Sequence, residues 1–310
     1  MRIATIDIGT NTILMLIAEI EPNGQINILG DYHYIARIGE GVDQHGVIQE
    51  KAFERAYNVF LELKKIAESS KVDKIIAFGT SALRSAKNRD VFLNFIKKEL
   101  SIEVKVISNE EEAKLTYLGA AFDYLQSNLI YDILAVDIGG GSTEIIYGKG
   151  RKIEAFKSVE IGSVRLTERI LNKYPPKQEQ IEKAIDLIKE HIKDIPKISS
   201  ITKAMGVAGT LTTLAAVDLK METFEPKLVH GHLLTYSNIQ AIFQELKLLT
   251  YEQLKKHPYI HPMRADIILA GTLILIEIMN KLNLETITVS TYGLRYGMLA
   301  EFVWTLNKNP

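Results

Sequence analysis

The chain has 310 residues, of which 46% are hydrophobic and 24% charged, with a formal net charge of −1 and no cysteine. This length and composition predict about two soluble globular domains. The lack of cysteine excludes disulfides, cysteine-ligated zinc and thiol nucleophiles, and the near-neutral charge provides no basic field for nucleic acid. The N-terminus lacks the apolar core of a signal peptide, and the apolar stretch at residues 267–279 is too short to cross a bilayer. We therefore expect a cytoplasmic protein without a nucleic-acid or membrane partner.

The N-terminal segment has the pattern strand, polar turn, strand. An apolar strand over residues 3–6 leads into Asp7-Ile8-Gly9-Thr10-Asn11-Thr12, and a second strand covers residues 13–20. A further meander follows, and apolar positions from residue 51 to 69 then recur at helical spacing. This order predicts the start of an α/β domain.

The next strand, over residues 74–78, ends at Thr80-Ser81-Ala82-Leu83-Arg84. Hydroxyls and an arginine beyond the carboxyl end of a strand occupy the place where open α/β sheets bind ligands. Ser81 and Arg84 are therefore candidate anion ligands, and a solvated surface charge is the alternative for Arg84. A helix over residues 90–100 and a strand over residues 102–107 continue the alternation.

Three successive glutamates open the helix that runs from residue 108 to about residue 125. Ser108 and Glu111 have the spacing of a capping box, in which the glutamate reaches back to the cap N–H. Glu110 lies in the first turn, where the helix dipole favours a negative charge. Glu112 has no such structural task, so it either points into a cleft or is a further dipole partner.

Residues 133–147 hold the most distinctive motif, in which an apolar strand ends at Asp137 and a glycine turn follows. The turn and the start of the next strand contain Gly139, Gly140, Gly141, Ser142, Thr143 and Glu144. Bare glycine N–H groups suit an anion, and phosphate is the usual one. The flanking carboxylates of Asp137 and Glu144 would repel phosphate unless a hard cation lay between them, which predicts Mg²⁺. The alternative is a plain glycine hairpin.

This motif repeats the pattern that begins at Asp7: strand, Asp-Ile-Gly, hydroxyl residue, strand. A single Asp-Ile-Gly would be a weak signal. Two copies, each at the end of a strand, predict two similarly built domains that face each other across a cleft.

The rest of the chain continues the α/β alternation. Strands are expected over residues 153–160, 204–207 and 286–290, and helices after Gly162, over residues 178–193 and at the C-terminal end. The strand at residues 204–207 ends in a turn with Gly209 and Thr210 that feeds a helix N-terminus, which again favours an anion. Arg264 is expected to open a long helix that ends at Lys281.

Other chemistries fit the sequence poorly. His230 and His232 lack an obvious third zinc ligand, and Pro258 interrupts the helix that the His257 and His261 pair would need. Walker A, GxGxxG and GxSxG patterns are absent. These absences argue against a P-loop NTPase, a dinucleotide-dependent oxidoreductase and a serine esterase.

Taken together and in order, a series of motifs resembles the exopolyphosphatase and guanosine pentaphosphate phosphohydrolase (Ppx/GppA phosphatase) family in its short two-domain form. The resemblance covers essentially the whole chain. The motifs are Asp7-Ile8-Gly9-Thr10-Asn11, Thr80-Ser81-Ala82-Leu83-Arg84, Ile107-Ser108-Asn109-Glu110-Glu111-Glu112-Ala113, Asp137-Ile138-Gly139-Gly140-Gly141-Ser142-Thr143-Glu144, Gly209-Thr210 with Thr212-Thr213-Leu214, His230-Gly231, Arg264-Ala265-Asp266 and Gly293-Leu294-Arg295.

The resemblance implies an α/β fold with two actin-like (ribonuclease H-like) domains of the ATPase superfold, with mixed sheets flanked by helices and a cleft between the domains. The first domain would comprise residues 1–128 and 297–310, and the second residues 129–296. It also implies a Mg²⁺- or Mn²⁺-dependent hydrolase that releases terminal phosphate from inorganic polyphosphate or the 5′ γ-phosphate from pppGpp. A homodimer that binds polyphosphate, pppGpp or ppGpp is expected.

The resemblance assigns roles residue by residue. Glu112 matches the base that activates water, and Asp137 and Glu144 match the metal ligands. The phosphate contacts would come from Gly9, Thr10, Asn11, Ser81, Arg84, Gly139, Gly140, Gly141, Ser142, Thr143, Gly209, Thr210 and Arg264.

The chain departs from the family pattern at three places. Asn109 and Ala208 stand where glycine is common, and Thr291-Tyr292 stands where an acidic residue is common. Ending at Pro310, the chain resembles members without the C-terminal helical domain, which favours pppGpp or short polyphosphate over long chains. Two rival functions remain: a kinase of the acetate or sugar type with the same superfold, and a non-catalytic (p)ppGpp sensor.

Overall fold

The computed structural model describes residues 1–126, 130–196, 198 and 201–308, and the chain divides into two compact units. Unit 1 comprises Met1–Phe122 and Leu294–Pro310, and unit 2 comprises Asp123–Gly293. The sequence placed the first junction between residues 128 and 129, which lie outside the described residues. The second junction lies before Leu294 rather than before residue 297, because the last helix begins at Leu294 and belongs to unit 1.

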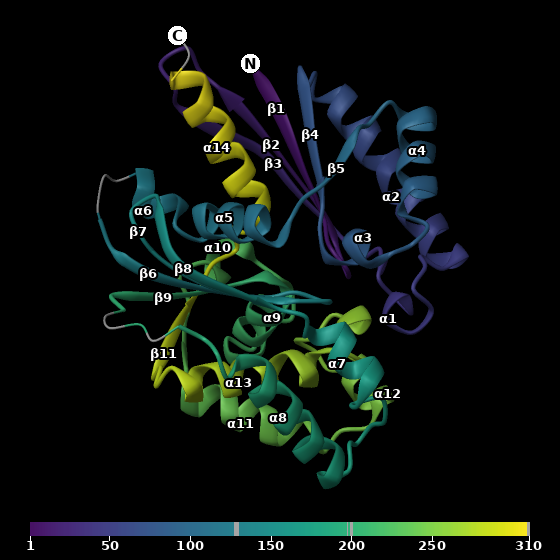
Figure 1. Ribbon diagram of the computed structural model, residues 1–310, viewed down its shortest axis with the longest axis vertical. Helices are drawn as coiled ribbons and strands as arrows, with labels where there is room; N and C mark the ends of the chain where they lie inside the picture. The colour runs from purple at the N-terminus through teal and green to yellow at the C-terminus, as the bar shows by residue number, and fades with distance from the viewer. Residues whose placement is uncertain (127–129, 197, 199–200, 309–310) are drawn as a thin grey trace. The chain divides into compact units, whose positions relative to one another are not determined.

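Unit 1 is built on a five-stranded mixed sheet with the order β3-β2-β1-β4-β5 (Figure 1). The first three strands form an antiparallel meander, and β4 and β5 add to β1 in parallel. The strands are β1 (Arg2–Ile8), β2 (Ile13–Ile20), β3 (Ile26–Tyr34), β4 (Lys74–Gly79) and β5 (Val104–Val106).

Two pairs of helices cover the two faces of this sheet (Figure 1). Helices α2 (Glu50–Ser69) and α4 (Arg89–Leu100) pack on one face, and α5 (Asn109–Ala120) and α14 (Leu294–Lys308) on the other. Side chains of a strand alternate between faces, so Ala4, Ile6 and Ile8 of β1 enter the core under α2 and α4. Thr5 and Asp7 therefore face α5 and α14, and the Thr5 hydroxyl donates to the Arg295 carbonyl at 2.9 Å.

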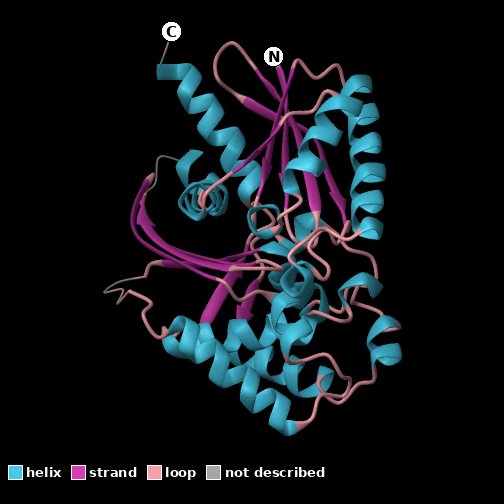
Figure 2. Cartoon of the chain, turned by 45° about the vertical axis from the view of Figure 1, so that its right-hand side comes forward, coloured by secondary structure: helices cyan, strands magenta, loops and turns pink. Residues whose placement is uncertain are grey.

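Unit 2 contains a six-stranded mixed sheet with the order β10-β11-β9-β6-β7-β8, and Figure 2 shows its helices stacked against one face. Strands β6, β7 and β8 form an antiparallel meander, and β9 runs parallel to β6. The strands are β6 (Asp132–Ile138), β7 (Thr143–Lys149), β8 (Lys152–Val159), β9 (Lys203–Val207), β10 (Leu233–Thr235) and β11 (Thr286–Val289).

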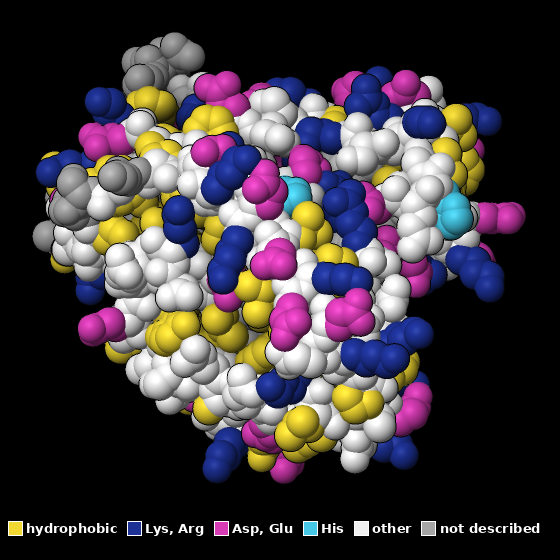
Figure 3. Space-filling view, turned by 60° about the horizontal axis from the view of Figure 1, so that its bottom comes forward, with side chains coloured by type: hydrophobic (Ala, Val, Ile, Leu, Met, Phe, Trp, Pro, Cys, Tyr) yellow, Lys and Arg dark blue, Asp and Glu magenta, His cyan; other side chains and the backbone are white. Residues whose placement is uncertain are grey.

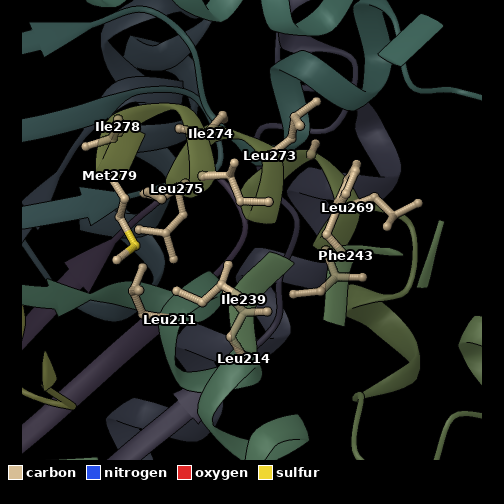
Figure 4. Close-up of a cluster of buried hydrophobic side chains, with 14 of the residues drawn as sticks. Leu211, Leu214, Ile239, Phe243, Leu269, Leu273, Ile274, Leu275, Ile278 and Met279 are labelled. Carbon is tan, nitrogen blue, oxygen red and sulfur yellow. The ribbon is translucent and has the colours of Figure 1, made fainter. Parts of the chain in front are cut away.

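The core of unit 2 surrounds α13 (Ile268–Lys281), which is buried on all sides from Ile268 to Met279. Figure 4 shows its side chains packed against those of α9 (Ala208–Asp218) and α11 (Tyr236–Leu246). The apolar stretch that is too short for a bilayer is thus a buried core helix. The remaining helices are α1 (Val42–His45), α3 (Ser81–Ser85), α6 (Phe122–Gln126), α7 (Ser163–Arg169), α8 (Gln178–Ile192), α10 (Pro226–Val229), α12 (Tyr251–Lys255) and the short 3-10 helix η1 (Pro262–Arg264).

The two sheets repeat one topology, which confirms the duplication predicted from the Asp-Ile-Gly motifs. In each unit a three-stranded meander is followed by a strand parallel to its first strand. The register shift of the meander falls between Ile17 and Ala18 in unit 1 and between Tyr147 and Gly148 in unit 2, at matching positions of the repeat. Mixed sheets flanked by helices are the predicted fold class.

Two predicted helix boundaries were wrong. The helix that holds the three glutamates ends at Ala120 rather than near residue 125. Arg264 lies in η1, and α13 begins only at Ile268. Helix α13 starts late because the Asp266 carbonyl accepts hydrogen bonds from the hydroxyls of Thr167 and Tyr174, in the place of a backbone N–H of the helix.

No helix in the described part of the chain is long and apolar enough to cross a membrane. On the face shown in Figure 3, basic and acidic side chains are interspersed, in keeping with the formal net charge of −1.

Candidate active site

The turn between β1 and β2 in unit 1 presents backbone N–H groups. The Gly9 N–H closes the turn by donating to the Thr12 carbonyl at 2.9 Å. The carbonyls of Thr10 and Asn11 accept from the loop that follows β3, at 2.8 and 2.9 Å. Among the described residues, the N–H groups of Thr10 and Asn11 have no acceptor. A turn whose carbonyls are engaged and whose N–H groups are not suits an anion.

Buried polar side chains with unmet hydrogen bonds gather beside this turn. Helix α3 begins next to the end of β1, because the Thr80 N–H donates to the Ile8 carbonyl at 3.1 Å. Both polar atoms of the Asn11 side chain, the Ser81 hydroxyl and Nη2 of Arg84 are buried without a partner in the described structure. Buried polar groups are nearly always hydrogen-bonded, so this group fits an absent polar ligand.

Arg84 and Glu112, predicted to have separate tasks, contact each other. Nη1 of Arg84 lies 2.5 Å from Oε2 of Glu112 and 3.2 Å from the Ile107 carbonyl. The side chains are 17% and 10% exposed, so this is a largely buried ion pair. Arg84 is therefore not the solvated surface charge that the sequence left as an alternative.

The three glutamates of α5 separate as the sequence predicts. Glu111 forms the capping box: its N–H donates to the Ser108 hydroxyl at 3.1 Å, and its carboxylate accepts from the Ser108 N–H at 3.2 Å. Glu110 is exposed, whereas Glu112 is buried with 8% exposure. Glu112 is thus the only one of the three whose carboxylate lies inside unit 1.

Asp7 is a residue of this region to which the sequence assigned no role. Burial and the negative charge of Glu112, opposed by the positive charge of Arg295, raise the pKa of Asp7 from 3.8 to about 7. The Arg295 guanidinium is also bidentate to Asp31, with both N–O distances 2.8 Å. Asp7 occupies the same position of the repeat as the predicted metal ligand Asp137. This equivalence is the sequence signal that could have identified Asp7 as a site residue.

The glycine turn of unit 2 has the same construction. The Gly139 N–H donates to the Ser142 carbonyl at 3.1 Å, and the carbonyls of Gly139 and Gly140 accept from the first turn of α7. The structure shows no acceptor for the Gly140 and Gly141 N–H groups among the residues that it describes. Gly162, just before α7, permits this contact, because a Cβ there would lie 2.5 Å from the Gly140 carbonyl.

The two side chains that follow this turn are buried. Ser142 is 2% exposed and Thr143 is fully buried. The Thr143 hydroxyl donates to the Ile161 carbonyl at 2.7 Å, so its only proton is used inside unit 2. Thr143 would therefore contribute to phosphate binding through the position of the backbone rather than through its hydroxyl.

Asp137 and Glu144 are direct cross-strand neighbours in the register of β6 and β7, so their side chains share one face of the sheet. Ser158 of β8 continues the row and donates to Oε1 of Glu144 at 2.8 Å. The described residues contain no group of three or more His, Cys, Asp or Glu side chains that could hold a metal. Mg²⁺ commonly takes one or two carboxylates and completes its shell with water and phosphate, so this pair fits a metal that binds together with a phosphate.

The N-terminus of α9 forms a further cationic position in unit 2. No side chain caps this helix, and the Arg264 guanidinium lies directly over Gly209, where a Cβ would be 1.6 Å from Nη1. Burial lowers the pKa of Arg264 to about 10, which leaves it charged. Thr210 follows Gly209 and is 5% exposed. Helix N–H groups with a buried arginine favour an anion.

Ala208 stands where the family pattern has glycine, and it has a φ of 69°. A Cβ in this left-handed region is strained. The backbone therefore keeps the conformation of the glycine turn in spite of the substitution.

Thr291 stands where the family pattern commonly has an acidic residue, and Asp123 provides a carboxylate in this region of unit 2. His230 accepts at Nδ1 from the Thr291 N–H at 3.2 Å, so Nε2 carries the proton and donates to Asp123 at 2.9 Å. The Tyr292 ring stacks on the imidazole with centroids 4.1 Å apart. A carboxylate from another part of unit 2 thus partners the histidine.

The structure therefore brings the predicted residues together as two groups. The unit 1 group contains Gly9, Thr10, Asn11, Ser81, Arg84 and Glu112, and the unit 2 group contains Gly139, Gly140, Gly141, Ser142, Thr143, Asp137, Glu144, Gly209, Thr210 and Arg264. The predicted interdomain cleft stays a prediction.

Two similar turns with donor N–H groups on duplicated mixed sheets, with a carboxylate pair on one of them, define a two-unit α/β protein whose turns suit an anion. A family model of the Ppx/GppA phosphatase family matches residues 16–305. The chain belongs to this family of hydrolases.

Relatives and solved structures agree with this assignment. Exopolyphosphatase 2 of Mycobacterium tuberculosis is 30% identical over 96% of this chain and 97% of that protein. The Bifunctional 3-dehydroquinate synthase/phosphatase of Fusobacterium nucleatum is 34% identical over 97% of this chain, which spans 46% of that relative. The crystal structure of the Aquifex aeolicus family member superposes with a TM-score of 0.82 and 33% identity, and the match covers 100% of this chain and 99% of that one.

Proposed function

We propose that this protein is a phosphoanhydride hydrolase that releases terminal phosphate from inorganic polyphosphate, the 5′ γ-phosphate from pppGpp, or both. The observation that carries the proposal is the group of buried, unsatisfied polar atoms on Asn11, Ser81 and Arg84 beside the N–H groups of the β1–β2 turn. They provide the donors that a terminal phosphate requires. The match to an exopolyphosphatase over nearly the whole of both chains supports the substrate class.

The chain's own residues can supply the steps of phosphoryl transfer to water. Such a transfer needs an aligned water, donors for the phosphate oxygens and a held leaving group. Arg84 and the turn N–H groups would bind the terminal phosphate, and Glu112 would orient the attacking water and accept its proton. The water oxygen forms the new bond to phosphorus as the bridging P–O bond breaks, and the shortened chain leaves with that electron pair.

Unit 2 would hold the leaving side of the substrate. Its glycine turn and the α9 N-terminus with Arg264 provide donors for further phosphates. Asp137 and Glu144 would bind Mg²⁺ or Mn²⁺, which when bound neutralises phosphate oxygens that two carboxylates would otherwise repel.

The test is phosphate release from polyphosphates of defined length, pppGpp and ATP, measured in parallel with Mg²⁺. We expect release from polyphosphate or pppGpp, with ATP a poor substrate. Glu112→Gln should lower kcat by at least about 100-fold, the usual contribution of a general base. Glu111→Gln, one residue away and able to keep the capping box, should leave kcat near the wild-type value.

Other outcomes would favour a rival function. Binding of pppGpp without phosphate release from any substrate would indicate a sensor. Transfer of phosphate to an acetate or sugar acceptor rather than to water would indicate a kinase. Near-normal turnover by Glu112→Gln would remove Glu112 from the mechanism and leave the hydrolase assignment standing.

A further inference from the structure

The contact between Arg84 and Glu112 occupies an atom that each residue needs for its proposed role. A base must have a carboxylate available for the proton of water, yet Oε2 of Glu112 lies 2.5 Å from Nη1 of Arg84. A phosphate-binding arginine must offer its donors to the substrate, yet Nη1 is shared between Glu112 and the Ile107 carbonyl. In this arrangement Oε2 of Glu112 and Nη1 of Arg84 are engaged with each other.

The second terminal nitrogen of the Arg84 guanidinium, Nη2, does not take part in this contact. Nη2 of Arg84 is buried and has no partner among the residues described. The Ser81 hydroxyl, one turn earlier on α3, is also buried without a hydrogen-bond partner among the described residues. Guanidinium binds phosphate most strongly in a two-pronged contact, so Nη2 supplies a first donor and Nη1 would be the second.

We propose that the terminal phosphate takes Arg84 away from Glu112, so that the base becomes available only when a phosphate is bound. This proposal rests on the proposed function and adds a control step to the same site. The phosphate first meets Nη2 and the Ser81 hydroxyl, and Nη1 then exchanges the Glu112 carboxylate for a second phosphate oxygen. Once Nη1 has turned to the phosphate, it no longer holds Oε2 of Glu112, and this oxygen can accept the hydrogen bond of the attacking water.

The exchange explains why a buried ion pair is kept at this place. A buried pair is often no better for stability than well-packed apolar side chains, so burial alone does not account for it. A purely structural pair that anchors α5 to α3 would stay intact when phosphate binds. The two alternatives differ in whether Glu112 and phosphate compete for Arg84.

A double-mutant cycle on phosphate binding tests this competition. The affinity for inorganic phosphate is measured by calorimetry, without divalent cation, for wild type, Glu112→Gln, Arg84→Met and the double variant. If phosphate must displace Glu112, then Glu112→Gln should tighten binding by about tenfold, a typical coupling between linked sites. In the Arg84→Met background the same change should alter binding by less than about twofold, because there is no pair to break.

Each other outcome overturns the proposal. Equal tightening in both backgrounds would mean that Glu112 merely repels phosphate, and no tightening in either would mean that the pair persists in the complex. The fluorescence of Trp304, the single tryptophan of the chain, checks that each variant keeps unit 1 folded, and Arg84→Lys provides a second variant if Arg84→Met does not fold. Because binding is measured without turnover, failure of the exchange is distinguishable from failure of the hydrolase assignment, which the phosphate-release assay decides.

Discussion

Asp7 offers the sharpest quantitative test of the structure, because its buried carboxyl should make unit 1 less stable as pH rises. Its pKa is raised to about 7 by burial and by Glu112, against the opposing charge of Arg295, whereas 3.8 is the value for an exposed carboxyl. Between these two pH values the native state holds a proton that the unfolded chain has lost. The native state therefore loses stability as pH rises from about 4 to about 7.

The size of the effect follows from the pKa difference. A rise from 3.8 to about 7 corresponds to about 4 kcal/mol, since a tenfold change in proton affinity is worth about 1.4 kcal/mol. Replacing Asp7 with asparagine removes the ionisation while it keeps the shape. We expect the free energy of unfolding of Asp7→Asn, relative to wild type, to rise by about 3 kcal/mol between pH 4.5 and pH 8, the part of the effect that this pH range covers.

The assay is urea unfolding at several pH values without divalent cation, followed by the fluorescence of Trp304, which lies on α14 in unit 1. The tryptophan reports unit 1 selectively, so the unfolding of unit 2 does not mask the transition. Glu111→Gln is a control of opposite sign. The hydrogen bond from Lys105 lowers the pKa of Glu111 from 4.5. The ionised Glu111 therefore stabilises the native state above this pH, and the stabilisation is lost as pH falls below it.

A stability difference between Asp7→Asn and wild type that does not change between pH 4.5 and pH 8 would refute the reasoning. It would mean that Asp7 ionises normally, through water or through a movement of Arg295 away from Asp31. A difference that grows in the opposite direction would mean that Asp7 is stabilised as a carboxylate, and the burial argument would then have the wrong sign.

Three further substitutions test unit 2. Ala208→Gly should raise the stability of unit 2 by roughly 0.5–1 kcal/mol in calorimetry. The substitution relieves about 1–2 kcal/mol of strain in the left-handed conformation and adds about 0.4–1 kcal/mol of chain entropy to the unfolded state. An unchanged or lower melting temperature would contradict this prediction. Gly209→Ala should displace the Arg264 guanidinium and raise KM at least about tenfold with a smaller change in kcat, as expected for a lost charged hydrogen bond, and a change in kcat alone would argue against that position. Ser158→Ala should weaken Mg²⁺ binding about tenfold in a calorimetric titration, as for other groups that orient a metal ligand, whereas Ser158→Thr should keep the hydroxyl and the affinity.

Much of the fold could be predicted from the sequence because its signals are local. The repeated strand, Asp-Ile-Gly turn and strand gave the duplicated sheets, and the spacing of Ser108 and Glu111 gave the capping box. The strand β10 was missed because its three residues are too few to show an alternating pattern. The delayed start of α13 depends on side chains of α7 and of the segment after it, and no local pattern around Arg264 records that contact.

The candidate site divides in the same way. Residue types in turns and at strand ends predicted which groups could bind phosphate or metal, and the register of β6 and β7 brings Asp137 and Glu144 side by side. The sequence could not show that Arg84 and Glu112 contact each other, because they lie on separate helices 28 positions apart. It also could not show the state of Asp7, since its pKa depends on which charges the fold places around one buried carboxyl.

The duplication explains why the two units can have different chemistry on the same framework. The aspartate that ends the first strand has a different partner in each copy: Asp7 pairs across the strands with Leu14, whereas Asp137 pairs with Glu144. An acidic partner makes a position for a cation, and an apolar partner leaves one carboxyl in a medium of low polarity. One difference at an equivalent position therefore separates the unit with the proposed metal ligands, Asp137 and Glu144, from the unit in which burial raises the pKa of Asp7. The proposed division of labour follows, with unit 2 holding the metal and the leaving phosphates and unit 1 activating water.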